Sequence, residues 1–250
     1  MKAISYRRYG GPEILEYGER PEPKVGPDSV LIRVKAAAVN PVDWKAQAGY
    51  LEPVLDAVFP VIPGWDVAGV VEQPGPAVTE FQPGDEVIGY VREDFLSRGT
   101  CAEYVAAPVR TLARKPRNLS FTQAAGIPLA GLTAYQCLVR ALRVGEGDTV
   151  LVHAGAGGVG SMAVQLARHM GARVIGTAGE RNHEYLRALG AEPTVYGDGL
   201  ADRVRALAPN GVDAVLDLVG GDALAVSSEL LAPGGRLASI ADPAVLGLGG

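Results

Sequence analysis

The stretch HAGAGGVGSMAVQLARHMGARVIGTAGERN, residues 153–182, decides the fold of this chain. Gly155, Gly157 and Gly160 follow the apolar run TVLVHA and open a helical run that ends near Gly171, after which comes a second apolar run, ARVIGT. Strand, glycine-rich turn, helix and strand form a unit that binds dinucleotide phosphates, because the turn admits the pyrophosphate and the helix N-terminus offers free N–H groups. The alternative is a turn that serves packing alone, and we favour dinucleotide binding.

The rest of the second half continues this alternation. The runs DAVLDLV (residues 213–219) and GRLASI (235–240) are apolar and strand-like, and helical runs separate the strands. Near-continuous apolar strands that alternate with helices indicate a parallel sheet covered on both faces. SFTQ at Ser120 has the form of a capping box, and Pro128 is expected to break or kink the helical stretch that follows. We therefore predict a doubly wound α/β domain over residues 120–250.

The first half has a different pattern. Short strand-like runs at residues 29–39, 66–73, 85–91 and 100–107 are separated by turn signals rich in Pro and Gly. One helix is expected among them, with Asn40 as its N-cap, Pro41 at its first position and Gly49 at its end. This pattern predicts a compact, barrel-like β domain over residues 1–119.

Composition narrows the function. The chain has 250 residues, of which 48% are hydrophobic, and a net charge of −5 without a Lys/Arg run, which argues against a nucleic-acid partner. No apolar run is long enough for a membrane span or a signal peptide, and Cys101 and Cys137 do not make a disulfide framework. A cytoplasmic enzyme is the expectation.

The end of ARVIGT bears on the choice of dinucleotide. NAD enzymes usually carry Asp or Glu there to bind the ribose 2′-hydroxyl. This chain has Thr177, then Gly179, and Arg181 soon after. A missing acid with a nearby Arg favours the 2′-phosphate of NADP(H), and the alternative for Arg181 is a solvated residue at a helix start.

Several stretches together resemble the medium-chain dehydrogenase/reductase superfamily, and within it the zinc-free quinone oxidoreductase (zeta-crystallin-like) branch. They are VNPVDWKAQAGY (39–50), PGWDVAGVVEQPGPAVTEFQPGDEVIGY (63–90), GTCAEYVAAP (99–108), AAGIPLAGLTAY (124–135) and VHAGAGGVGSMAVQLAR (152–168). The resemblance implies a GroES-like β-barrel domain for the substrate, followed by a Rossmann domain for the cofactor, with the active site in the cleft between.

The resemblance also assigns cofactor contacts residue by residue. Asn40 and Thr133 would lie near the nicotinamide, and Gly179, Arg181 and Tyr196 near the adenosine. The pyrophosphate would contact Ala156, Gly157, Gly158 and Val159, and the nicotinamide ribose would contact Leu218, Val219, Ile240 and Ala241.

No metal site is expected. In zinc-dependent relatives the positions of Asn40 and Trp65 hold Cys and His ligands, and neither side chain here is a usual zinc ligand. The three histidines, His153, His169 and His183, fit structural roles better. Without a Lewis acid, reduction of a simple ketone is harder, whereas a quinone or enone accepts hydride on carbon.

The expected activity is therefore NADPH-dependent, zinc-independent reduction of a small conjugated carbonyl compound. Asn40 and Tyr50 are the candidate catalytic residues, with Tyr50 as proton donor or orienting hydroxyl, or else as an aromatic wall of the cleft. Two alternatives fit the same loop. One is an enoyl-thioester reductase of lipid or polyketide synthesis, which a missing basic patch disfavours, and the other is a non-catalytic NADPH-binding protein.

The resemblance implies several tens of residues after GRLASI, including a sixth strand, which this sequence does not contain. The Rossmann domain is thus expected to lack its usual C-terminal portion, with GRLASI as an edge strand. Either the sequence is part of a longer protein or the protein tolerates the loss. A homodimer of the kind that zinc-free relatives form through that last strand is possible, and the short C-terminus argues against it.

Overall fold

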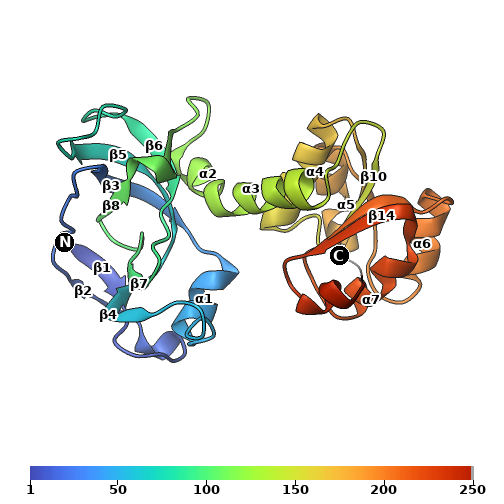
Figure 1. The fold of residues 1–250 in the computed structure, drawn as a ribbon, viewed down its shortest axis with the longest axis horizontal. Coiled ribbons are helices and arrows are strands. Elements are labelled where there is room, and N and C mark those ends of the chain that lie inside the picture. Colours follow the sequence, from blue (N-terminus) through green and yellow to red (C-terminus); the bar gives the residue numbers. More distant parts are fainter. Residues whose placement is uncertain (249–250) are drawn as a thin grey trace. The chain divides into compact units, whose positions relative to one another are not determined.

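The computed structural model describes residues 1–248, and the chain divides into two compact units, Met1–Leu129 and Ala130–Gly250 (Figure 1). The expected domain boundary at residues 119–120 stays a prediction, because these units reflect compactness alone. No helix within residues 1–248 is long and apolar enough to cross a membrane.

The first unit is built on an antiparallel sheet with the order β8-β3-β5-β6-β9. Small sheets of β1 with β2 and of β4 with β7 accompany it. Valine and isoleucine side chains from the large sheet, among them Val30, Ile32 and Val67, form a buried core. The bounds are β1 (Lys2–Ser5), β2 (Glu16–Glu19), β3 (Ser29–Ala38), β4 (Ala57–Ile62), β5 (Asp66–Pro74), β6 (Glu86–Tyr90), β7 (Leu96–Arg98), β8 (Tyr104–Pro108) and β9 (Leu112–Arg114).

Three of the four predicted strands of this unit are confirmed, as β3, β5 and β6, and the fourth starts late. Residues 100–103 do not join β8, because Thr100 and Cys101 donate their N–H groups to the loop carbonyls of Gly64 and Pro63. The predicted helix is α1 (Pro41–Gln47), with Asn40 as N-cap and Gly49 at φ +89° after its end. Two 3-10 turns complete the unit, η1 (Pro12–Ile14) and η2 (Val109–Thr111).

The predicted capping box and the break at Pro128 are confirmed. Ser120 caps α2 (Phe121–Ala125), its backbone N–H donates to Gln123, and α3 (Pro128–Tyr135) begins at the proline. A π-helical segment, η3 (Gln136–Ala141), continues α3.

The second unit contains a five-stranded parallel sheet with the order β12-β11-β10-β13-β14, so β14 lies at an edge as expected. The sequence pattern missed β12, which has only three residues with Pro193 in the middle. The strands are β10 (Thr149–Val152), β11 (Arg173–Thr177), β12 (Glu192–Thr194), β13 (Val212–Asp217) and β14 (Leu231–Ser239). The helices are α4 (Gly158–His169), α5 (His183–Leu189), α6 (Leu200–Leu207) and α7 (Asp222–Glu229), with 3-10 turns η4 (Glu180–Asn182) and η5 (Pro243–Leu248).

Helices cover both faces of this sheet, as the apolar strands predict (Figure 1). Val150 and Val152 of β10 belong to the core that includes α4 and α5, whereas Leu151 belongs to the core that includes α6 and α7. Neighbouring residues of one central strand are thus fully buried on opposite faces. The doubly wound α/β fold is therefore confirmed.

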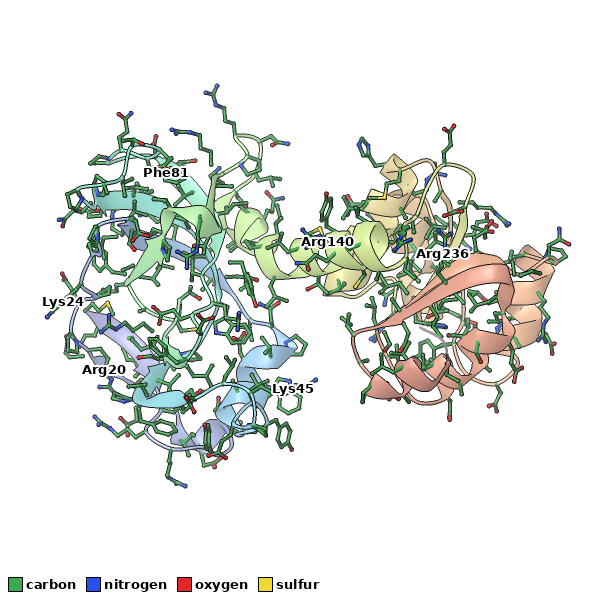
Figure 2. All side chains as sticks on the ribbon, viewed as in Figure 1. Arg20, Lys24, Lys45, Phe81, Arg140 and Arg236 are labelled. Atoms are coloured by element: carbon green, nitrogen blue, oxygen red, sulfur yellow. The ribbon has the colours of Figure 1, made fainter. Side chains whose placement is uncertain are left out.

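Arg236 fastens the edge strand β14 to the loop before β10 (labelled in Figure 2). Its guanidinium donates to the Asp148 carboxylate at 2.7 Å and to the carbonyl oxygens of Arg143 and Asp213 at 2.9 and 3.3 Å. Charge-assisted bonds of this kind are the stronger ones in proteins. Arg143, which accepts one of these bonds, has a left-handed backbone conformation, at φ +49°.

Candidate functional site

The glycine loop joins β10 to α4, and the absence of a side chain has a different effect at each of its glycines. A Cβ added to Gly160 would lie 2.3 Å from the carbonyl oxygen of Ala154 and 2.8 Å from the Cα of Gly155, so the helix could not approach the loop. A Cβ on Gly157 would meet only that oxygen, at 3.2 Å, and one on Gly158 would meet nothing within 4 Å. Gly160 therefore serves packing, while the backbone at Gly157 and Gly158 stays open to a ligand.

A groove of about 1140 Å³ lies at the carboxyl ends of the parallel strands, where open α/β sheets bind ligands. We call it the glycine-loop groove. Of the residues expected at the cofactor, those that line it are Ala156, Gly157, Thr177, Gly179, Arg181, Tyr196 and Val219. The residues that do not line it are Gly158, Val159, Leu218, Ile240 and Ala241. Gly158 and Val159 begin α4 directly after Gly157, which does line the groove. Thr133 lies on α3, and Asn40 and Tyr50 lie in the first unit.

Arg181 is the one Lys or Arg side chain that lines the groove within residues 1–248, and its guanidinium has no partner among them. It is exposed on the turn η4, next to Glu180. Arg203 follows the loop of residues 195–199, part of which lines the groove. Its guanidinium already donates hydrogen bonds to the carbonyl oxygens of residues 195–198. Arg203 thus holds the loop that carries Tyr196, and Arg181 is left available for an anion.

Two residues that line the groove, His153 and Thr177, form a buried polar chain with Ser227. His153 Nε2 lies 2.9 Å from Ser227 Oγ, and His153 Nδ1 lies 3.4 Å from Thr177 Oγ1. The Thr177 hydroxyl also accepts from the Ala154 N–H at 3.0 Å. Thr177 is only 1% exposed, so its hydroxyl faces the protein interior. The expected structural role of His153 agrees with this arrangement, whereas no pattern in the sequence pointed to Ser227.

Asp217, at the end of β13, organises the loops that carry the expected ribose contacts. Its fully buried carboxylate accepts from the N–H groups of Val219 and Gly220 and from the Ser239 hydroxyl at 2.6 Å. Ser239 in turn accepts from the N–H groups of Ala241 and Asp242. Sequence reasoning missed both residues, and the available signal was an acid at the end of an apolar strand just before Gly-Gly.

In the first unit, Asn40 is held by two acids that sequence reasoning did not single out as a pair. Its side-chain amide donates to Asp66 Oδ2 at 2.9 Å, and its backbone N–H donates to Asp43 Oδ2 at 2.6 Å. The other oxygen of Asp66 accepts from the Leu129 N–H at 2.9 Å. The Asn40 amide therefore uses one of its two N–H donors on Asp66 and keeps the other for another group.

Burial dominates the electrostatics of this cluster. It raises the pKa of the Asp66 carboxyl to about 6, against the lowering effect of the bonds from Asn40 and Leu129. It also raises the pKa of Asp43, although the N–H groups of Asn40 and Gly64 act in the opposite direction. Partial burial, with a smaller contribution from the charge of Asp43, raises the pKa of the Cys101 thiol to about 11, so the thiol is protonated at neutral pH.

Tyr50 lies in the turn after α1 and is 67% exposed. Its ring meets Trp44 edge-on at 5.9 Å, and its hydroxyl has no hydrogen-bond partner within residues 1–248. Trp65 packs edge-on against Tyr90 at 6.0 Å. No three His, Cys, Asp or Glu side chains come together as a metal site in the part of the chain that the structure describes. The absence of zinc stays a prediction.

Comparison with known proteins gives matches in both halves. Residues 26–117 match the alcohol dehydrogenase GroES-like domain, and residues 158–245 match the family described as zinc-binding dehydrogenase. The chain is 42% identical over 227 residues to an NADPH-dependent alkenal/one oxidoreductase of Arabidopsis thaliana, covering 88% of this chain and 58% of that protein. It thus spans less than three fifths of that relative.

Two further relatives match over more of their own length. Human quinone oxidoreductase is 32% identical, with 95% of this chain and 72% of that protein covered. The solved structure of the quinone oxidoreductase from Coxiella burnetii superimposes with a TM-score of 0.86 at 40% identity, covering 99% of this chain and 78% of that one.

Proposed function

The chain belongs to the medium-chain dehydrogenase/reductase superfamily, in its quinone oxidoreductase branch, and from this we propose that it is an NADPH-dependent, zinc-independent reductase of quinones or other conjugated enones. The observation that carries the proposal is the glycine-loop groove, in which Arg181 is the one unpaired cation among the described residues. The names of the relatives support both the cofactor and the class of acceptor.

The choice of NADP(H) depends on the end of β11. A carboxylate there would repel a 2′-phosphate, and this chain has Thr177, whose hydroxyl is turned inward. Arg181 is close by, exposed and without a competing partner in the described chain. A guanidinium can bind a phosphate through two parallel, charge-assisted hydrogen bonds. We assign Arg181 to the 2′-phosphate.

NADPH, when bound, would supply the hydride. A quinone or enone takes it on carbon and spreads the resulting charge through conjugation, so the protein mainly has to align the reactants. The Asn40 side chain is a neutral amide, so it can form hydrogen bonds to a substrate or cofactor but has no acidic proton with which to protonate a product. Tyr50, whose hydroxyl has no hydrogen-bond partner within residues 1–248, is the better proton donor of the two candidate catalytic residues.

The remaining contacts and partners are proposed on the same basis. The acceptor is a small molecule and the protein works in the cytoplasm without nucleic acid, which the net charge of −5 supports. The expected residues that line the groove contact the cofactor, and Gly158 and Val159 do so through the first turn of α4.

An enoyl-thioester reductase remains the rival enzyme. A pantetheine phosphate needs its own cation, and the groove offers only Arg181 among its described lining residues. Consumption of NADPH should be measured with 1,4-benzoquinone, 9,10-phenanthrenequinone and a crotonyl thioester, before and after chelation of metals. Turnover of the quinones that survives chelation is expected. Turnover of the thioester alone, or activity lost to chelator, would overturn the proposed acceptor or the zinc independence, and no turnover would favour the non-catalytic alternative.

The cofactor assignment has its own test, in which NADPH and NADH are titrated into the wild type and Arg181→Ala. Loss of a charge-assisted bond should weaken NADPH binding about 10- to 150-fold and leave NADH unchanged. Arg187→Ala is the matched control, because Arg187 lies on the following helix, pairs with Glu184 and does not line the groove. Equal weakening of both cofactors by Arg181→Ala would refute the assignment.

A further inference from the structure

We infer that His153 is a positioning residue for the glycine loop: as a neutral imidazole protonated on Nε2, it links Ser227 to Thr177 and so orients the hydroxyl that holds the Ala154 N–H. The hydrogen-bond directions follow from the structure itself. Its role in cofactor binding rests on the proposed function, because the loop is the proposed pyrophosphate site.

The direction at one end of the chain is set by Ser227. Its hydroxyl lies 2.6 Å from the carbonyl oxygen of Ala223, which can only accept, so the single hydroxyl proton points there. Toward His153 Nε2, at 2.9 Å, the Ser227 oxygen can then only accept. The proton of the imidazole must therefore be on Nε2, which leaves Nδ1 as a bare acceptor.

The direction at the other end is set by the backbone. The Ala154 N–H can only donate, and it does so to Thr177 Oγ1 at 3.0 Å. The proton of the Thr177 hydroxyl is then free to point at His153 Nδ1, 3.4 Å away. The bonds run one way, from Ala154 N–H through Thr177, His153 and Ser227 to the Ala223 carbonyl. Each donor on this path meets an acceptor only if His153 is neutral.

Burial makes the loss of any hydrogen bond in this chain costly. His153 and Ser227 are fully buried and Thr177 is 1% exposed, so water cannot easily replace a missing partner. Burial lowers the pKa of His153, and Asp217, at the end of the neighbouring strand β13, acts to raise it. Burial prevails, in agreement with the hydrogen-bond directions.

Thr177 consequently holds two successive residues of the loop. Its hydroxyl binds the Ala154 N–H, and its backbone carbonyl binds the Gly155 N–H at 2.9 Å. Ala154 has φ +49°, a left-handed conformation that alanine seldom adopts, so it needs such an anchor. The next residues, Ala156 and Gly157, line the groove. Thr177 therefore acts on the cofactor through the shape of the loop.

The decisive measurement is the tautomer of His153 in the protein without ligand, from ¹⁵N-histidine NMR spectra, with the signal assigned by its loss in His153→Gln. A neutral ring protonated on Nε2 is expected at pH 7. A ring protonated on Nδ1, or an imidazolium, would overturn the inference whatever the protein binds.

Variants of Thr177 then test the consequence for the loop. Thr177→Val keeps the shape and removes the hydroxyl, and it should weaken NADPH and NADH binding alike, by about tenfold or more, whereas Thr177→Ser should restore both to near wild type. Thermal unfolding confirms that each variant is folded. Unchanged affinities in folded Thr177→Val would overturn the role in the loop. Arg181→Ala affects NADPH alone, so a failure of the 2′-phosphate assignment remains distinguishable.

Discussion

Asp66 should make the first unit less stable at neutral pH than an uncharged residue would. Its carboxyl is fully buried, and burial raises its pKa to about 6, against an ordinary value of about 3.9. Between these values the folded protein binds more protons at this site than the unfolded chain does. The free energy of unfolding therefore falls as the pH rises through this window, and the penalty is complete above about pH 6.

The substitution Asp66→Asn removes the charge while keeping both hydrogen bonds. The new side-chain oxygen can accept from the Leu129 N–H, and the new amide can donate to Asn40 once the Asn40 amide rotates by half a turn. Two pH units correspond to about 3 kcal/mol, which is an upper bound for the stabilisation at pH 7. Near pH 4 the Asp66 carboxyl of the folded wild type is protonated and uncharged, as the variant is. The difference in the free energy of unfolding between variant and wild type should therefore be smaller near pH 4 than at pH 7, by up to about 3 kcal/mol.

Urea unfolding at several pH values between 4.5 and 8 provides the assay. Trp44 and Trp65 are the only tryptophans of the chain and both lie in the first unit, so their fluorescence reports on it. Asp94→Asn is the control, because the side chain of Asp94 is 99% exposed. A difference between Asp66→Asn and wild type that stays constant over this pH range would refute the reasoning.

Three other changes have expected outcomes that follow from contacts in the second unit. Gly160→Ala should destabilise the fold by about 1–3 kcal/mol in thermal unfolding, because its Cβ would lie 2.3 Å from a backbone oxygen. Gly158→Ala should unfold like wild type, because its Cβ would meet nothing within 4 Å, and equal losses in the two variants would contradict this. Ser239→Ala removes the hydroxyl that donates to Asp217 and accepts from Ala241 and Asp242, and it should cost about 1–3 kcal/mol in urea unfolding; a loss below about 0.5 kcal/mol would mean that water replaces the hydroxyl. Glu192→Gln breaks a half-exposed ion pair with Arg173 and should lower the free energy of unfolding by about 1 kcal/mol or less, and by still less in 1 M NaCl. A larger loss, or one that salt does not reduce, would contradict the interpretation of this contact as a solvent-screened ion pair.

Local signals in the sequence predicted the fold well where they act alone. Asn40 and Gly49 bound α1, and Gly171 follows α4 at φ +86°, because caps and left-handed turns depend on the residue itself. The short strand β12 was missed because a strand of three residues with a central proline has no periodic pattern. Its place in the sheet comes from pairing with β11.

The candidate site was predictable in part, for a related reason. The open backbone at Gly157 and the free cation at Arg181 follow from the motif and its neighbours in sequence. Asp66 and Asp217 could not be found in that way, because each acts on groups that the fold brings to it from elsewhere. Thr177 shows the limit most clearly, since its position at the end of β11 was evident, but the inward direction of its hydroxyl was not.

The alanine at position 154 has a thermodynamic consequence for ligand capture. Glycine would adopt φ +49° without strain, but it would also leave the turn more conformations to lose. Alanine reduces the number of backbone conformations that the turn can adopt without a ligand. The folded protein holds this alanine in a strained conformation in return. The turn therefore loses most of its conformational entropy when the chain folds. Less entropy is lost when a dinucleotide binds, so more of the contact energy can appear as affinity.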